Sequence, residues 1–194
     1  IEIEHAMYVG ARNFGSRVSR AYLDPRSHLQ IDDARTYFSA GHRKYDVIIS
    51  EPSNPWVSGV ASLFTREFYS FLRRHLSDGG IAIQWIQSYE LSDALMATMV
   101  AALIEEFPFV HAYTTNGADL LFVVSESPLP ALQFERLESD EYKSELPRVG
   151  LHGRADFDVR RIGDRSTLEA FAALHGASPH SDFYPVVSLE APRT

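Results

Sequence analysis

The chain has 194 residues, a formal net charge of −8 and a composition that is 45% hydrophobic and 12% aromatic, which predicts one main globular domain with an ordinary core. The negative charge argues against a nucleic-acid backbone as the main partner and tolerates cationic partners such as polyamines, and no apolar run reaches the ~20 residues of a membrane-spanning helix. Cysteine is absent, which excludes disulfides, thiolate catalysis and sulfur-ligated zinc, and a reducing cytoplasm is the expected compartment.

The N-terminal residues predict the end of a strand followed by a helix. The sequence IEIE alternates apolar and acidic side chains, and a helix is predicted from His5 to Phe14 with Gly15 in the usual helix-stop position. In nucleotide-binding α/β folds an acid at a strand end accepts both hydrogen bonds of a ribose diol, which makes Glu2 a candidate. The alternative is that Glu2 and Glu4 are solvated acids favoured by the helix dipole. We expect the N-terminus to be a cut edge of a longer protein.

A second strand and helix follow. His28 to Ile31 predicts a short strand, and Asp33 stands directly before a helix that carries Tyr37 and Phe38 on its inner side. Aspartate is among the best N-cap residues, so a capping role is expected of Asp33 and needs no ligand.

The centre of the chain is a buried strand that ends in a long polar loop. The β-branched run Val47 to Ile49 predicts a strand covered on both faces of a parallel sheet, with Glu51 at its carboxyl end, where ligands of open α/β sheets lie. Pro52 and Pro55 fix the backbone on either side of Asn54. About a dozen residues separate the strand from the next helix, against the usual two to six, which favours a functional loop over a plain Pro/Ser/Asn turn.

The elements after this loop alternate helix and strand. Thr65 is predicted to cap a helix with one apolar face that ends at Asp78-Gly79-Gly80, and Ile81 to Ile83 predicts a buried strand with Gln84, Trp85 and Gln87 at its carboxyl end. For Trp85 packing is the expected role. Ser92 is predicted to cap a helix that ends at Phe107.

The last part of the chain predicts a hairpin and then a change of character. Phe109 to Tyr113 and Leu120 to Val124 predict two strands joined through Asn116-Gly117. After Pro128-Leu129-Pro130 come an acidic amphipathic stretch, Gln133 to Tyr142, and a helix around Ser166 to Leu174. His175, His180 and Asp182 suggest a metal site, but their irregular spacing among Gly, Pro and Ser favours histidines in surface loops, and we predict no metal.

Residues 1 to 125 resemble the spermidine synthase family of aminopropyltransferases, which use the class I S-adenosylmethionine methyltransferase fold. The family pattern is a strand, Asp-Ser-(Ser/Thr)-Asp-Pro, a Gly/Pro-rich loop, Leu-Phe, a helix and a Gly-Gly turn. Here it is Glu51-Pro52-Ser53-Asn54-Pro55, then Leu63-Phe64 and Gly79-Gly80. The resemblance implies an α/β, Rossmann-like sheet with flanking helices and no first strand, in a domain 1–127 followed by an extension 128–194 of unassigned role.

The resemblance also implies a role for each candidate residue. The cofactor would be S-adenosylmethionine or its decarboxylated form, with Glu2 on the ribose and Asp33 and Ala34 at the adenine. Glu51 and Asn54 would be the catalytic pair, at the positions of the family's two aspartates. Ser53 and Pro55 would also contact the cofactor, and Gln84 and Trp56 the amine.

The chain departs from the family pattern at several points. Asp32 replaces a glycine, the Gly-rich turn of the first strand is absent, and so is the Pro-Thr-Tyr-Pro-Ser-Gly segment that helps to recognise the polyamine. GARNFG, Gly10 to Gly15, follows the acidic strand instead of preceding it and is not the missing motif. We therefore expect the fragment alone to be inactive.

Three functions remain open on the sequence. The first is alkylation of a small-molecule amine in polyamine biosynthesis. The second is methyl transfer, because Asn54-Pro55-Trp56 is similar to the Asn-Pro-Pro-(Tyr/Phe) loop of amine and amide methyltransferases. The third is a catalytically degenerate module of a larger, membrane-attached protein whose cytosolic part this would be. A homo-oligomer is compatible with each, and the acceptor is not identified.

Overall fold

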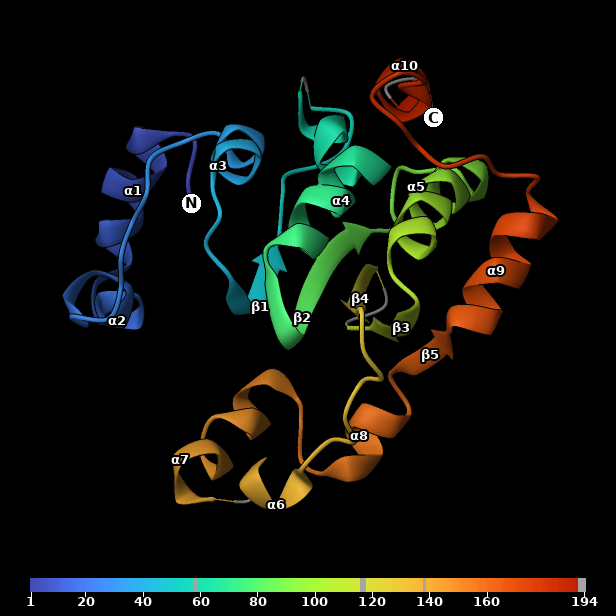
Figure 1. Cartoon of the computed structure of the whole chain (residues 1–194). Coiled ribbons are helices and arrows are strands. Elements are labelled where there is room, and N and C mark those ends of the chain that lie inside the picture. The colour runs from blue at the N-terminus through green and yellow to red at the C-terminus, as the bar shows by residue number, and fades with distance from the viewer. Residues whose placement is uncertain (58, 116–117, 138, 192–194) are drawn as a thin grey trace. The chain divides into compact units, whose positions relative to one another are not determined.

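The structure, a computed structural model, describes residues 1–57, 59–115, 118–137 and 139–191 (Figure 1). The chain forms two compact units, Ile1–Arg43 and Lys44–Thr194. The expected Asn116-Gly117 turn lies outside the described residues. Among those residues no helix is both long and apolar enough to cross a bilayer.

The first unit is helical with a single bridge between extended segments. Its elements are α1 (His5–Ala11), the 3-10 helix η1 (Arg12–Arg17), α2 (Ser19–Leu23) and α3 (Ala34–Ala40). The two expected strands meet only in one parallel bridge, Glu2 with Ile31. The first helix stops at Ala11, short of the predicted Phe14, because the chain tightens into η1 and turns at Gly15, whose φ is 60°.

The second unit is built on a mixed five-stranded sheet, and the predicted α/β class is confirmed (Figure 1). The strand order is β1-β2-β4-β3-β5, in which β1 and β2 are parallel and the other pairs antiparallel. The bounds are β1 Tyr45–Ser50, β2 Leu76–Gln87, β3 Phe109–Thr114, β4 Asp119–Ser125 and β5 Arg161–Asp164. The strands predicted at 109–113 and 120–124 are therefore an antiparallel pair, as expected.

Three helices cover one face of this sheet. They are α4 (Arg66–Arg74), α5 (Asp93–Glu106) and α9 (Arg165–Leu174), and α5 packs against both others. The predicted caps are confirmed, since Thr65 Oγ1 accepts the amide of Phe68 and Ser92 Oγ accepts that of Leu95, both at 3.3 Å. Nine residues of α5 are buried, so this helix is the centre of the core.

The prediction that the 47–49 run is buried on both faces is wrong. Ile48 is 7% exposed, but Val47 and Ile49 on the opposite face are 51% and 67% exposed. Successive side chains of a strand point to opposite faces. In the described part of the chain the helical layer covers only the Ile48 face of β1.

The prediction that Asp78-Gly79-Gly80 ends the α4 helix is also wrong. The helix ends at Arg74 and these residues lie inside β2, where the pairing with β1 shifts register between Tyr45 and Val47. Gly79 has φ 73°, and a Cβ on Gly80 would lie 2.9 Å from the Ser77 carbonyl oxygen. The two glycines therefore permit an irregular strand start.

Residues beyond 127 add several short elements to the second unit. They are α6 (Phe134–Leu137), α7 (Asp140–Lys143), η3 (Leu146–Val149), α8 (Arg154–Asp158) and α10 (Val186–Glu190), besides β5 and α9. The acidic stretch 133–142 thus holds two single-turn helices, and α9 confirms the helix predicted around 166–174. Strand β5 extends the sheet by pairing with β3, which sequence patterns did not indicate.

Candidate functional site

The loop after β1 carries the candidate catalytic residues at the carboxyl end of a parallel strand pair. Ser50, the last residue of β1, is in register with Gln84 of β2, and Glu51 follows it with an exposed side chain. Ser53 is exposed, whereas Pro55 is buried. The Asn54 carbonyl accepts the amide of Val57 at 2.9 Å, and the loop then enters η2 (Val60–Phe64).

An aromatic contact joins this loop to the segment after β2. The rings of Trp56 and Tyr89 meet edge to face with centroids 6.5 Å apart. The contact brings together the two segments that leave the carboxyl ends of β1 and β2. Trp56 follows Asn54 by two residues in this loop, and its ring pair with Tyr89 is the kind of surface against which an alkylammonium group packs.

The side chain of Gln84 is buried and not exposed to solvent. Its side chain points to the opposite face of β2 from that of Trp85, and Gln84 is 1% exposed. Its Nε2 donates to the Trp85 carbonyl oxygen at 2.9 Å, and its Oε1 has no hydrogen-bond partner among the described residues. A contact between Gln84 and a substrate stays a prediction.

Gln87 is a polar residue whose role the sequence did not single out. It is fully buried at the end of β2, and neither its Oε1 nor its Nε2 has a hydrogen-bond partner in the described part of the chain. An unsatisfied buried amide costs about 1–3 kcal/mol per group, so such a residue marks a place where water or a ligand supplies the bond. The available signal was a second glutamine, after Gln84, at the end of the largely apolar stretch 81–87.

In the first unit the parallel bridge brings the two candidate nucleoside-binding acids into adjacent segments. The Glu2 amide donates to the Gln30 carbonyl oxygen at 2.9 Å and the Asp32 amide to the Glu2 carbonyl oxygen at 3.1 Å. Glu2 Oε1 accepts the amide of Glu4, and Asp33 Oδ1 accepts that of Thr36, both at 2.8 Å. The predicted N-cap role of Asp33, directly before Ala34, is confirmed. Each bond uses one carboxylate oxygen, and a carboxylate can accept several more.

The C-terminal anchor, defined as His180, Ser181 and Asp182, holds the other end of the site loop. The expectation of surface histidines is wrong for His180, which is 1% exposed. Its amide donates to the Thr98 carbonyl oxygen, its carbonyl accepts the amide of Arg66, both at 3.0 Å, and its Nε2 lies 3.1 Å from the Ala61 carbonyl oxygen. His180 therefore joins η2, α4 and α5.

The anchor also fixes a carboxylate at the start of α4. Ser181 Oγ and the Asp182 amide donate to the two oxygens of Glu67 at 2.8 and 3.0 Å, and Arg66 Nε donates to Oε1 at 3.0 Å. Burial alone would raise the pKa of Glu67, but these donors outweigh it and lower the pKa to about 2. Burial lowers the pKa of His180. No group of three His, Asp or Glu side chains in the described regions could hold a metal ion.

Comparison with known proteins decides the family. The profile of the spermine/spermidine synthase domain matches residues 1–117. The chain belongs to this family. The matched part includes Glu2, Asp33 and the whole loop from Glu51 to Phe64, whereas the C-terminal anchor lies beyond it.

Individual relatives agree with this family. A polyamine aminopropyltransferase of Nitrosomonas europaea is 32% identical over 113 residues, which are 58% of this chain and 34% of that protein. The chain thus spans about a third of the length of that relative. A crystal structure of spermidine synthase in complex with the transition-state analogue AdoDATO has a TM-score of 0.71 at 17% identity, covering 89% of this chain and 60% of the other.

The fold is shared with methyltransferases as well. Human methyltransferase-like protein 13, solved in complex with SAH, has a TM-score of 0.51 at 19% identity, with 76% of this chain and 68% of that one covered. The predicted class I methyltransferase-like fold of this spermidine synthase family member is therefore confirmed.

Proposed function

We propose that this chain forms part of a transferase that alkylates an amine, with decarboxylated S-adenosylmethionine or S-adenosylmethionine as the group donor. The observation that carries the proposal is the family match over residues 1–117, which includes Glu51 at the carboxyl end of β1. Because the chain spans about a third of the aminopropyltransferase of N. europaea, the activity belongs to the complete protein.

The residues present fit a nucleoside of this kind by their chemistry. When bound, the cofactor supplies an electrophilic carbon next to a sulfonium. Glu2 would accept the ribose hydroxyls with its carboxylate, and Asp33 with Ala34 would bind the adenine amino group. Ser53 and Pro55 would line the cofactor from the loop. The support is the parallel bridge beside Glu2 and the free lone pairs of both carboxylates.

Glu51 and Asn54 would handle the incoming amine. An amine attacks only through a free lone pair, so Glu51 would accept an N–H bond, orient the nitrogen and take its proton at a carboxylate oxygen. Its negative charge would also favour the positive charge near the sulfonium. Asn54 would accept a second N–H bond without charge, and Trp56 would form the apolar side of the amine site with Tyr89.

A second candidate is methyl transfer to an amine or amide nitrogen. Asn54-Pro55-Trp56 supports it, because a carboxamide accepts a target N–H bond without requiring a charged substrate. The shared fold with a methyltransferase is compatible with this function. The third candidate is a module that has lost catalysis, since Asn54 stands where the synthases have an aspartate.

Calorimetry of the full-length protein separates these functions. S-adenosylmethionine, its decarboxylated form and methylthioadenosine would be titrated in turn. Tighter binding of the decarboxylated form supports aminopropyl transfer, and tighter binding of S-adenosylmethionine supports methyl transfer. Absence of binding by all three contradicts both enzymes and leaves the degenerate module.

A further inference from the structure

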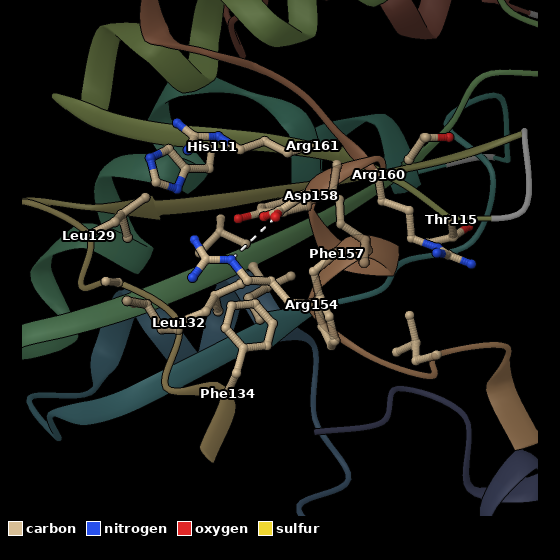
Figure 2. Close-up of a pocket in the computed structure, with 18 of the residues that line it drawn as sticks. His111, Thr115, Leu129, Leu132, Phe134, Arg154, Phe157, Asp158, Arg160 and Arg161 are labelled. Atoms are coloured by element: carbon tan, nitrogen blue, oxygen red, sulfur yellow. Dashed lines mark hydrogen bonds and ion pairs between the residues drawn. The ribbon is translucent and has the colours of Figure 1, made fainter. Parts of the chain in front are cut away.

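The sheet of the second unit borders a cavity of about 790 Å³ on the face turned away from the helical layer (Figure 2). Its floor includes Ile81, Ile83, Leu121 and Val123, which alternate along β2 and β4 with the buried residues of the other face. Its opposite wall comes from the segment 129–134 and from α8 to the start of β5. No residue of the Glu51–Phe64 loop lines it, so the cavity is separate from the proposed transfer site.

The cavity is positively charged within an acidic chain. Arg154, Arg160 and Arg161 line it together with one aspartate, Asp158, although the formal charge of the whole chain is −8. Outside the lining, the Asp156 carboxylate lies 3.8 Å from Arg160 Nη1. Arg154 Nε lies 3.3 Å from Asp158 Oδ2, and Arg160 donates to the carbonyl oxygens of Asp156 and Gly150 at 2.7 and 3.3 Å. Arg161 makes no hydrogen bond or ion pair with any described side chain, so its N–H groups are available to a ligand, although Asp164 interacts with its charge at longer range.

The cations are grouped rather than spread along the wall. Figure 2 shows the guanidinium of Arg161 beside the ring of His111, with Arg154 and Asp158 on the same side, whereas Arg160 points toward Thr115. The Arg154 guanidinium also lies over the ring of Phe134, 5.1 Å from its centroid. One end of the cavity is thus cationic and aromatic, and its floor is aliphatic.

We propose that this cavity binds a small amphiphilic anion, a carboxylic acid with a medium-length apolar body. The volume is within the range of about 300–1,000 Å³ typical of small-molecule sites. The aliphatic floor would cover the apolar body, and the planar guanidinium of Arg161, together with Arg154, matches a carboxylate with two parallel N–H bonds. A polyamine, by contrast, would be repelled by the same arginines.

Titration of the 194-residue chain with decanoate tests the proposal. Decanoate is expected to bind saturably at one site, with acetate, decylamine and spermidine each at least ~10-fold weaker, because each lacks either the apolar body or the negative charge. Equal binding of decanoate and decylamine would show that the arginines do not select the ligand and would overturn the proposal.

Variants locate the binding. Arg161→Gln should weaken decanoate about 10-fold or more, since a charge-assisted hydrogen bond is lost, and Val123→Trp should abolish binding by filling the floor. Arg136→Gln removes an exposed arginine of α6 that lies outside the cavity and should leave the affinity unchanged. Circular dichroism verifies that each variant is folded.

Two results would reject this site. One is an Arg161→Gln affinity equal to that of the unchanged chain. The other is a dimer seen by sedimentation in which Val123→Trp restores monomers, since the face would then be an interface between copies. Because spermidine and S-adenosylmethionine are not expected in this cavity, failure here leaves the proposed transferase function untouched.

Discussion

At the scale of single residues, the transferase proposal depends on a carboxylate and a carboxamide in one loop. Glu51 is exposed directly after a strand whose last residue pairs with Gln84, and Asn54 follows between two prolines. The prolines restrict the backbone, so the two side chains start from fixed positions. Removing charge while keeping shape is the appropriate test of such a pair.

Glu51→Gln is expected to lower turnover of the full-length protein by at least ~10²-fold, the lower end of what a positioned acid–base group contributes. Nucleoside affinity should change little, because the ribose and adenine contacts are assigned elsewhere. Steady-state kinetics and calorimetry measure the two effects, with Glu135→Gln on the exposed face of α6 as control. Unchanged turnover would reduce Glu51 to a loop residue and favour the methyltransferase alternative.

Asn54→Asp restores the acidic residue of the synthase pattern and is expected to strengthen the binding of a diamine. A second carboxylate would then face the second ammonium group, and an opposite charge at short range favours the charged form. Affinity for a diamine, compared with a monoamine of equal length, measures the effect. Equal changes for both amines would argue against a two-point site.

Glu67 in the C-terminal anchor contact predicts a dependence of stability on pH. Its pKa is lowered in the fold to about 2 from an ordinary 4.5, so its contribution is complete above about pH 4.5 and is lost as the pH falls toward 2. Glu67→Gln should therefore cost about 1–3 kcal/mol of unfolding free energy at pH 7 and less at pH 3. Urea unfolding at both pH values tests this, with Glu145→Gln, from an exposed ion pair, as control.

At the scale of elements, local signals predicted the structure well wherever the partner is near in sequence. Thr65, Ser92 and Asp33 cap helices as expected because the bonded amide is three residues away. The end of α4 was mispredicted because Gly79 and Gly80 serve a register shift against β1, which the local pattern does not contain. The burial of Val47 and Ile49 was mispredicted for a similar reason. Their β-branched side chains predict a strand, but they do not indicate which elements cover its two faces.

Gly80→Ala is expected to destabilise the second unit by more than about 1 kcal/mol. The new Cβ would meet the carbonyl oxygens of Ser77, Tyr45 and Asp46 at 2.9, 3.0 and 3.2 Å, and backbone atoms cannot swing away as the end of a flexible side chain can. Thermal unfolding measures the loss. Gly10→Ala, inside α1 with nothing within 4 Å of its Cβ, should instead stabilise its helix by about 0.5–1 kcal/mol. A tolerated Gly80→Ala would show that the strand start adapts.

At the scale of the whole molecule, the domain boundary expected between residues 127 and 128 remains a prediction. Elements on the two sides of this position pack against each other. Beyond it lie β5, which pairs with β3, and α9, which packs on α5. Sequence analysis could place the family pattern and the Glu51 loop, because these are local. It could not place β5 or the buried His180, because both depend on partners far along the chain.

A chain ending at residue 127 is expected to lose cooperative unfolding, because α5 would expose the apolar surface that Leu168 and Ala172 of α9 bury. Binding of a hydrophobic dye and the shape of the denaturant transition measure this against the 194-residue chain. An unfolding midpoint equal to that of the longer chain would establish 1–127 as an independent domain.

The bond between His180 and Ala61 spans 119 residues, and this separation has a consequence for the order of events during synthesis. The loop after β1 leaves the ribosome first, and the residues that hold η2 and Glu67 follow 119, 114 and 115 residues after their partners. Domains fold as their contacts become available, and contacts of large sequence separation form late. A nascent chain therefore carries Glu51 on an unsecured loop until translation has passed His180, so any activity that requires the ordered loop begins only after that point.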